Sequence, residues 1–68
     1  MKVHHVGYLV KRLARSEEAF RKVGFSVEQD VMYDNIRDVN ISFMRNGDYC
    51  VELIEPASKT SPLYPLLK

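Results

Sequence analysis

One segment of this chain has helical periodicity, and the other regular segments alternate as β-strands do. Within residues 13–23, Leu13, Phe20 and Val23 fall at helical spacing, and acidic side chains precede basic ones, as the helix dipole favours. Gly24 then provides a C-terminal stop. The sequence therefore predicts a single helix, which can cover only one face of a β-sheet.

Four segments are predicted to be strands because apolar and polar residues alternate in them. These segments are residues 3–10, 25–33, 39–44 and 49–54. Between the last two, Asn46-Gly47 predicts a tight hairpin with a type I′ turn. The predicted order is therefore βαβββ, an α+β fold with one four-stranded sheet.

The composition changes near Pro56, because residues typical of turns and linkers follow it. We predict one folded module at residues 1–56 and a linker-like C-terminal tail at residues 57–68. The 68 residues make one domain, and a domain of this size often depends on a metal, disulfides or a partner subunit. Cys50 is the single cysteine, which excludes an intrachain disulfide, and we interpret it as a small buried hydrophobe.

Charge and hydropathy argue against several classes of protein. Ten basic and nine acidic residues leave a net charge of +1, whereas a nucleic-acid-binding protein would show a basic excess. No apolar run approaches the length of a membrane helix, so we expect no membrane partner. The first residues do not match a signal peptide, and a cytoplasmic protein is the expectation.

Two residues carry the chemistry that the sequence suggests. Strand alternation places His5 on one face with Gly7, and it places Glu52 on one face with Cys50 and Ile54. If the first and last strands are neighbours with these faces matched, an imidazole and a carboxylate converge on a partly apolar floor. That is half of a divalent-metal site, because a metal normally takes more protein ligands than two. The simpler alternative is a hydrogen-bonded histidine and a solvated carboxylate.

The helix is expected on the other face of the sheet. The core predicted there consists of side chains of the first and last strands packed against the helix. The strand residues are Val6, Tyr8, Val51 and Leu53, and the helix residues are Phe20 and Val23. The face with the two candidate ligands is too apolar to be left to water, so we expect something to cover it. Glu55 is interpreted as a surface charge, and Arg37 either as an ordinary surface residue or as a group that holds a substrate phosphate or carboxylate.

The ordered set of motifs resembles the vicinal-oxygen-chelate superfamily, which includes glyoxalases, bleomycin resistance proteins and dioxygenases. Within it the chain looks most like the glyoxalase I and methylmalonyl-CoA epimerase branch. The resemblance covers nearly the whole chain and lies in HHVGYLV at residues 4–10, KRL at 11–13, FRKVGF at 20–25, RDVNISF at 37–43 and NGDYCVELIEP at 46–56.

The resemblance implies a metal site and a reaction class. Family members contain two βαβββ modules whose sheets curve together around a divalent metal, and each module gives one ligand from its first strand and one from its last. By position these ligands are His5 and Glu52. The metal is zinc or nickel in glyoxalase I and commonly cobalt in epimerases, and both enzymes remove a proton next to a carbonyl. Glu52 would act as the base and favours the glyoxalase branch, because epimerases often carry glutamine there.

The chain departs from the family pattern because it carries one module instead of two. Either two copies pair about a two-fold axis and complete the site, or the chain is the N-terminal half of a longer protein. Three functions stay open: a metal-dependent lyase or isomerase with a small-molecule substrate, a non-catalytic module that sequesters an antibiotic or another ligand, and an orphan half module or structural module without a site.

Overall fold

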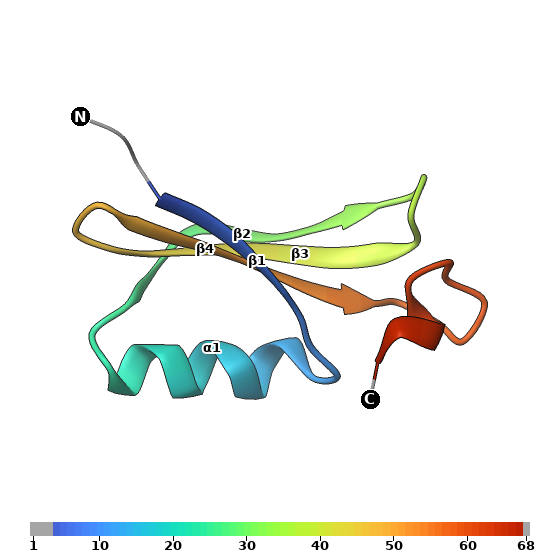
Figure 1. The fold of residues 1–68 in the computed structure, drawn as a ribbon, viewed down its shortest axis with the longest axis horizontal. Helices are drawn as coiled ribbons and strands as arrows, with labels where there is room; N and C mark the ends of the chain where they lie inside the picture. Colours follow the sequence, from blue (N-terminus) through green and yellow to red (C-terminus); the bar gives the residue numbers. More distant parts are fainter. Residues whose placement is uncertain (1–3, 68) are drawn as a thin grey trace.

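The computed structural model describes residues 4–67, with only the backbone of residues 4 and 5. The chain folds in the predicted order βαβββ, and Figure 1 shows the helix under one face of the sheet. A short 3-10 helix follows the last strand. The elements are β1 (His4–Leu9), α1 (Leu13–Lys22), β2 (Ser26–Asp34), β3 (Val39–Asn46), β4 (Tyr49–Pro56) and η1 (Tyr64–Leu66).

The sheet brings the first and last strands together, although they are far apart in the sequence. The strand order is β1-β4-β3-β2, with β1 parallel to β4 and the other pairs antiparallel. β2 is an edge strand whose pairing with β3 shifts register twice, between Val27 and Gln29 and between Gln29 and Met32. β1 pairs with β4 without a shift, so the two edges of the sheet differ in regularity.

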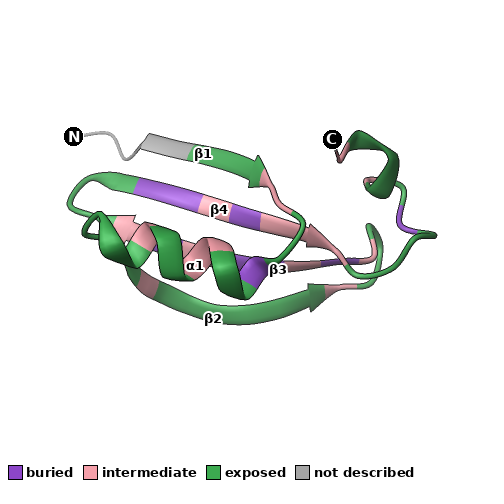
Figure 2. Cartoon of the chain, turned by 90° about the horizontal axis from the view of Figure 1, so that it is seen from below, coloured by how far each residue is buried: buried purple, intermediate pink, exposed green. Residues whose placement is uncertain are grey.

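The hydrophobic core lies between α1 and the middle of the sheet. Its buried members are Leu13, Met44, Val51 and Leu53. Figure 2 shows the buried segments of β3 and β4 behind the helix, while β2 is largely exposed. Of the core residues predicted from the sequence, Val51, Leu53 and the partly buried Phe20 are confirmed.

Three residues predicted for the core are instead exposed. Val6 is 47%, Tyr8 is 45% and Val23 is 66% exposed. The helix packs mainly on β2, β3 and β4, and the edge strand β1 lies at its margin. The predicted contact between Tyr8 and Phe20 is nevertheless confirmed, because their ring centroids are 5.8 Å apart. Periodicity predicted which face of β1 turns toward the helix layer but not which strands the helix covers.

The C-terminal end of α1 forms a Schellman motif around Gly24. The Gly24 N–H donates to the Arg21 carbonyl oxygen at 3.1 Å, and the Phe25 N–H donates to the Phe20 carbonyl oxygen at 3.0 Å. The two phenylalanine rings meet edge to face, with centroids 5.2 Å apart. The predicted stop at Gly24 is therefore confirmed, and the same motif directs the chain into β2.

Gly24→Ala is expected to lower the free energy of unfolding by about 1–2 kcal/mol, because φ at this position is +101°. A Cβ there would also lie 3.0 Å from Asn46 Nδ2. Urea unfolding followed by circular dichroism measures the change. Gly47→Ala is the comparison, since Gly47 also has a positive φ of +61° but open space around it; it should lose stability through φ alone and therefore less than Gly24→Ala. A Gly24→Ala protein as stable as the parent would contradict this account.

The N-terminal end of α1 is capped by a residue from β4. Arg12, at the N-cap position, makes no side-chain capping bond. The Glu55 carboxylate instead accepts hydrogen bonds from the Leu13 N–H and from Asn40 Nδ2, each at 3.1 Å. The interpretation of Glu55 as a surface charge is wrong, because the side chain is partly buried on the helix side and ties β3 and β4 to α1.

The β3–β4 hairpin differs in detail from its prediction. Asn46 pairs with Tyr49, so the two loop residues are Gly47 and Asp48. Gly47 has φ +61°, whereas Asp48 is not among the described residues with positive φ. A type I′ turn needs positive φ at both central positions, so the type I′ prediction is wrong and the φ values match type II′.

No helix in residues 4–67 combines the length and the apolar character that crossing a membrane requires.

Candidate functional site

The pairing of β1 with β4 sets the positions of the two predicted metal ligands. His5 pairs with Cys50 and Gly7 pairs with Glu52, and neighbouring residues in register share a face of a sheet. Position 5 and Glu52 therefore lie on the same face, away from α1, with Cα atoms roughly 8 Å apart by standard strand spacings. The side chain of His5 lies outside the described residues, so its role as a ligand stays a prediction.

Glu52 is partly buried beside a position that has no side chain. A Cβ at Gly7 would lie 3.9 Å from Glu52 Oε1 and 3.7 Å from the Ile54 side chain. On its other side Glu52 pairs with Phe43 of β3. The carboxylate thus lies between an aromatic residue and the space above Gly7, which a larger residue at position 7 would fill.

Glu52 lines a hollow of about 450 Å³ on the face of the sheet opposite α1. Apolar side chains form much of the lining, and polar ones come from the β2–β3 turn, which rises above this face in Figure 1. The lining residues are Met32, Tyr33, Asp34, Asn35, Arg37, Ile41, Phe43 and Glu52. An apolar hollow with a few polar groups is typical of small-molecule sites.

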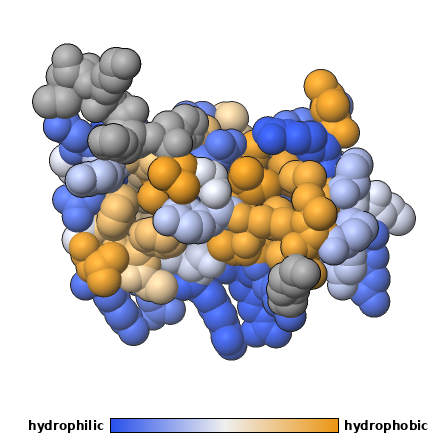
Figure 3. Space-filling view, viewed as in Figure 1, coloured by the Kyte–Doolittle hydropathy of each residue, from blue (hydrophilic) through white to orange (hydrophobic). Residues whose placement is uncertain are grey.

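A second hollow, of about 510 Å³, lies where apolar residues gather between the end of β1 and the C-terminal segment (Figure 3). It is lined by Lys11, Arg12, Pro56, Tyr64, Pro65 and Leu67. The described residues of this lining include no carboxylate, imidazole or thiol. This hollow is slightly larger, but only the hollow at Glu52 has a described carboxylate in its lining, so the hollow at Glu52 is the better candidate.

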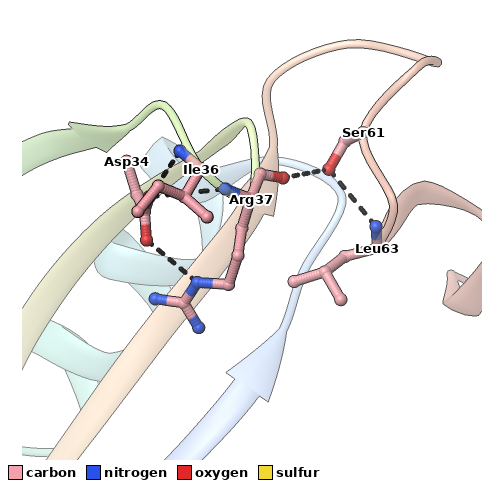
Figure 4. Close-up of polar contacts among 5 residues, drawn as sticks. All are labelled: Asp34, Ile36, Arg37, Ser61 and Leu63. Carbon is pink, nitrogen blue, oxygen red and sulfur yellow. Dashed lines mark hydrogen bonds and ion pairs between the residues drawn. The ribbon is translucent and has the colours of Figure 1, made fainter.

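The turn beside the Glu52 hollow is ordered by Asp34 and Arg37, as Figure 4 shows. Asp34 Oδ2 accepts from Arg37 Nε at 2.9 Å, and Asp34 Oδ1 accepts from the Ile36 N–H at 2.9 Å. These hydrogen bonds lower the pKa of Asp34 below its usual value, and the bond from the Arg37 side chain has the largest effect. Asp34 therefore stays ionised at neutral pH and keeps the guanidinium of Arg37 in place.

The C-terminal tail holds the same turn from behind. Ser61, only 2% exposed, donates from Oγ to the Arg37 carbonyl oxygen at 2.7 Å and accepts from the Leu63 N–H at 3.3 Å. The Ala57 N–H donates to the Asp38 carbonyl oxygen at 2.8 Å. Residues 57–63 therefore fix the position of the turn that borders the hollow.

Asp38 is the centre of a second set of bonds in this turn. It has φ +54°, which is uncommon for a residue other than glycine, and its carboxylate accepts from Ser58 Oγ and Tyr33 Oη. The hydrogen bond from Ser58, and to a smaller extent that from Tyr33, lowers the pKa of Asp38. The hydrogen bond between Tyr33 and Asp38 also raises the pKa of Tyr33. The left-handed conformation is thus supported by bonds to both β2 and the tail.

Cys50 lies on the same face as Glu52 but has the character of a core residue. It is 7% exposed, as the sequence predicted for a buried hydrophobe, and its Sγ lies 3.7 Å from Glu28 Oε1. Burial raises the pKa of the thiol, and the negative charge of Glu28 raises it further by a smaller amount. Glu28 in turn pairs with Arg45 Nε at 3.0 Å. A thiol that stays protonated is a poor nucleophile and a poor metal ligand.

In the part of the chain that the structure describes with side chains, no three histidine, cysteine, aspartate or glutamate residues are grouped around a common point. Glu52 has the right chemistry for a divalent cation, since carboxylates bind zinc and related metals. A complete ligand set, however, needs groups from outside these residues. The donor groups fit one half of a metal site.

Sequence motifs that pointed to Glu52 did not identify Asp34 or Ser61. Asp34 directly follows the predicted strand at residues 25–33, and Ser61 belongs to the segment predicted as a linker-like tail. The one available signal was turn chemistry, because aspartate and serine favour turns through bonds to nearby backbone atoms. That signal does not indicate that the two residues meet at one turn of the fold.

Two solved structures share the fold across nearly all of this chain. A hypothetical protein of Bacillus halodurans C-125 is 23% identical with a TM-score of 0.82, covering 96% of this chain and 47% of its own. A methylmalonyl-CoA epimerase of Streptomyces coelicolor, in complex with 2-nitronate-propionyl-CoA, is 20% identical with a TM-score of 0.80, covering 98% of this chain and 52% of its own. The chain thus spans about half the length of these structures.

Among curated proteins none matches the chain. The family model described as the Glyoxalase/Bleomycin resistance protein/Dioxygenase superfamily matches residues 4–65, which is nearly the full length. That match agrees with the βαβββ order, the four-stranded sheet and the open face that carries Glu52. The chain belongs to the glyoxalase/bleomycin resistance protein/dioxygenase superfamily, the vicinal-oxygen-chelate proteins, and forms a single βαβββ module of that fold.

Proposed function

We propose that the module is half of a metal-dependent lyase or isomerase that removes a proton next to a carbonyl, in the manner of a glyoxalase I or a methylmalonyl-CoA epimerase. The observation that carries the proposal is the β1–β4 register, which puts position 5 and Glu52 on one face. The space above Gly7 and the hollow beside Glu52 supply room for a substrate. The epimerase among the structures of the same fold supports this reaction class.

A second module is needed to complete the site, and the fold offers a place for it. Phe43, Glu52 and Ile54 lie on the face opposite α1 and are only partly buried, and no helix within residues 4–67 lies over that face. The regular edge of β1 is better suited to pairing with another strand than the irregular edge of β2. A second copy related by a two-fold axis, or a second module of a longer chain, would add its own ligand pair.

The residues of this chain would divide the chemistry as follows. His5 and Glu52 of each module would hold one divalent cation, zinc, nickel or cobalt. When bound, the cation would supply Lewis-acid stabilisation of the negative charge that develops on the carbonyl oxygen. Glu52 would accept the proton from the adjacent carbon, while Ile41 and Phe43 would exclude water from the carboxylate.

The proposal is tested by measuring the molar mass of the untagged protein by light scattering, together with its metal content by mass spectrometry. We expect a dimer with one divalent ion per two chains after purification without chelator. A monomer that binds no added zinc, nickel or cobalt would contradict the proposal. A dimer that stays free of metal would favour instead the sequestering of a ligand in the cleft between two modules.

A further inference from the structure

Arg37 is fixed in position but keeps one hydrogen-bonding edge unused. Asp34 binds its Nε at 2.9 Å, and Ser61 binds its carbonyl oxygen at 2.7 Å. Among the described residues, no hydrogen bond or ion pair engages the two terminal nitrogens, Nη1 and Nη2. Figure 4 shows the end of the guanidinium directed away from the turn. Two terminal guanidinium nitrogens can donate two parallel hydrogen bonds to the oxygens of one carboxylate or phosphate group.

Arg37 and Glu52 line the same hollow, at places separated by apolar side chains. Glu52 pairs with Phe43 across β4 and β3, and Ile41 lies two residues further along β3, where it pairs with Met32 of β2. The β2–β3 turn that carries Arg37 follows beyond these residues. A ligand lying along the hollow therefore meets a carboxylate, an apolar stretch and a guanidinium in that order.

The charge balance at the turn permits an anionic ligand. Asp34 neutralises part of the Arg37 charge, but it engages the guanidinium through Nε and so holds the free edge in a defined direction. The Arg37 side chain is 45% exposed and is one of the residues that line the hollow. Preorganised donors bind with less loss of side-chain entropy than mobile ones.

We propose that the hollow takes an extended acyl or keto compound with a terminal anionic group, which Arg37 binds end-on while the reacting carbonyl lies near Glu52. The assignment of the carbonyl end rests on the proposed function above. The assignment of the anionic end rests on Arg37 alone. A short apolar chain between the two groups would cover Ile41, Phe43 and Met32.

The test uses three probes of similar size with metal-free protein: hexanoate, pentyl phosphate and the neutral hexanamide. Binding is followed by NMR titration of the backbone amides. We expect one or both anions to bind about threefold to fivefold more tightly than hexanamide, with shifts at Ile41 and Phe43, as a solvent-exposed ion pair allows. Arg37→Gln should remove this preference, and Arg37→Lys should keep part of it. Arg15→Gln, on an exposed position of α1, should leave it unchanged.

Two outcomes would overturn the inference: equal affinity for all three probes, or a preference for the anions that survives Arg37→Gln with native amide spectra. Failure of the proposed function would look different. A protein that takes up no metal but retains an Arg37-dependent preference for anions would disprove the metal chemistry and leave the anion subsite standing.

Discussion

Glu52→Ala is expected to lower metal affinity by more than about 100-fold, because it removes one of the two ligands that each module would contribute. Calorimetric titration with zinc and with cobalt measures the change. His5→Ala should have a similar effect. Glu18→Ala is the control, since that carboxylate lies exposed on α1. If the Glu52→Ala protein keeps the affinity of the parent, Glu52 is not a ligand.

Glu52→Gln separates metal binding from proton transfer. The amide oxygen can still bind a cation, but the amide cannot accept a proton at neutral pH. We therefore expect the Glu52→Gln protein to retain much more metal than Glu52→Ala and to lose exchange of the proton next to the carbonyl of a bound substrate. Equal metal loss in both variants would mean that the negative charge itself holds the ion.

Leu53→Ala is expected to lower the free energy of unfolding by about 3 kcal/mol, because Leu53 is fully buried beneath α1. A domain of this size has a total stability of only several kcal/mol, so the variant should be largely unfolded at moderate temperature. Thermal unfolding followed by circular dichroism measures the loss. Leu66→Ala is the matched control, because Leu66 is 62% exposed. If both variants lose a similar free energy of unfolding, Leu53 does not belong to the core that stabilises the fold.

Local patterns were sufficient for the elements of this fold. Alternation and helical spacing depend on side chains close in sequence, and they correctly predicted the helix, the four strands and the end of α1 at Gly24. They failed where the outcome depends on how elements pack. Glu17 illustrates this, because it reaches across to the buried Ser42 of β3, a partner that no local pattern indicates.

The candidate site divides in the same way. Strand alternation in the sequence determined that Glu52 lies on the face of β4 opposite its core residues, and the family resemblance suggested His5 as its companion. Only the tertiary structure decided that β1 lies beside β4 in matching register, that the space above Gly7 adjoins the Glu52 carboxylate, and that Ser61 orders the turn carrying Arg37. The physical reason is that alternation is imposed by neighbouring residues along a strand. Contacts between distant segments arise only when the sheet, the helix and the tail pack together.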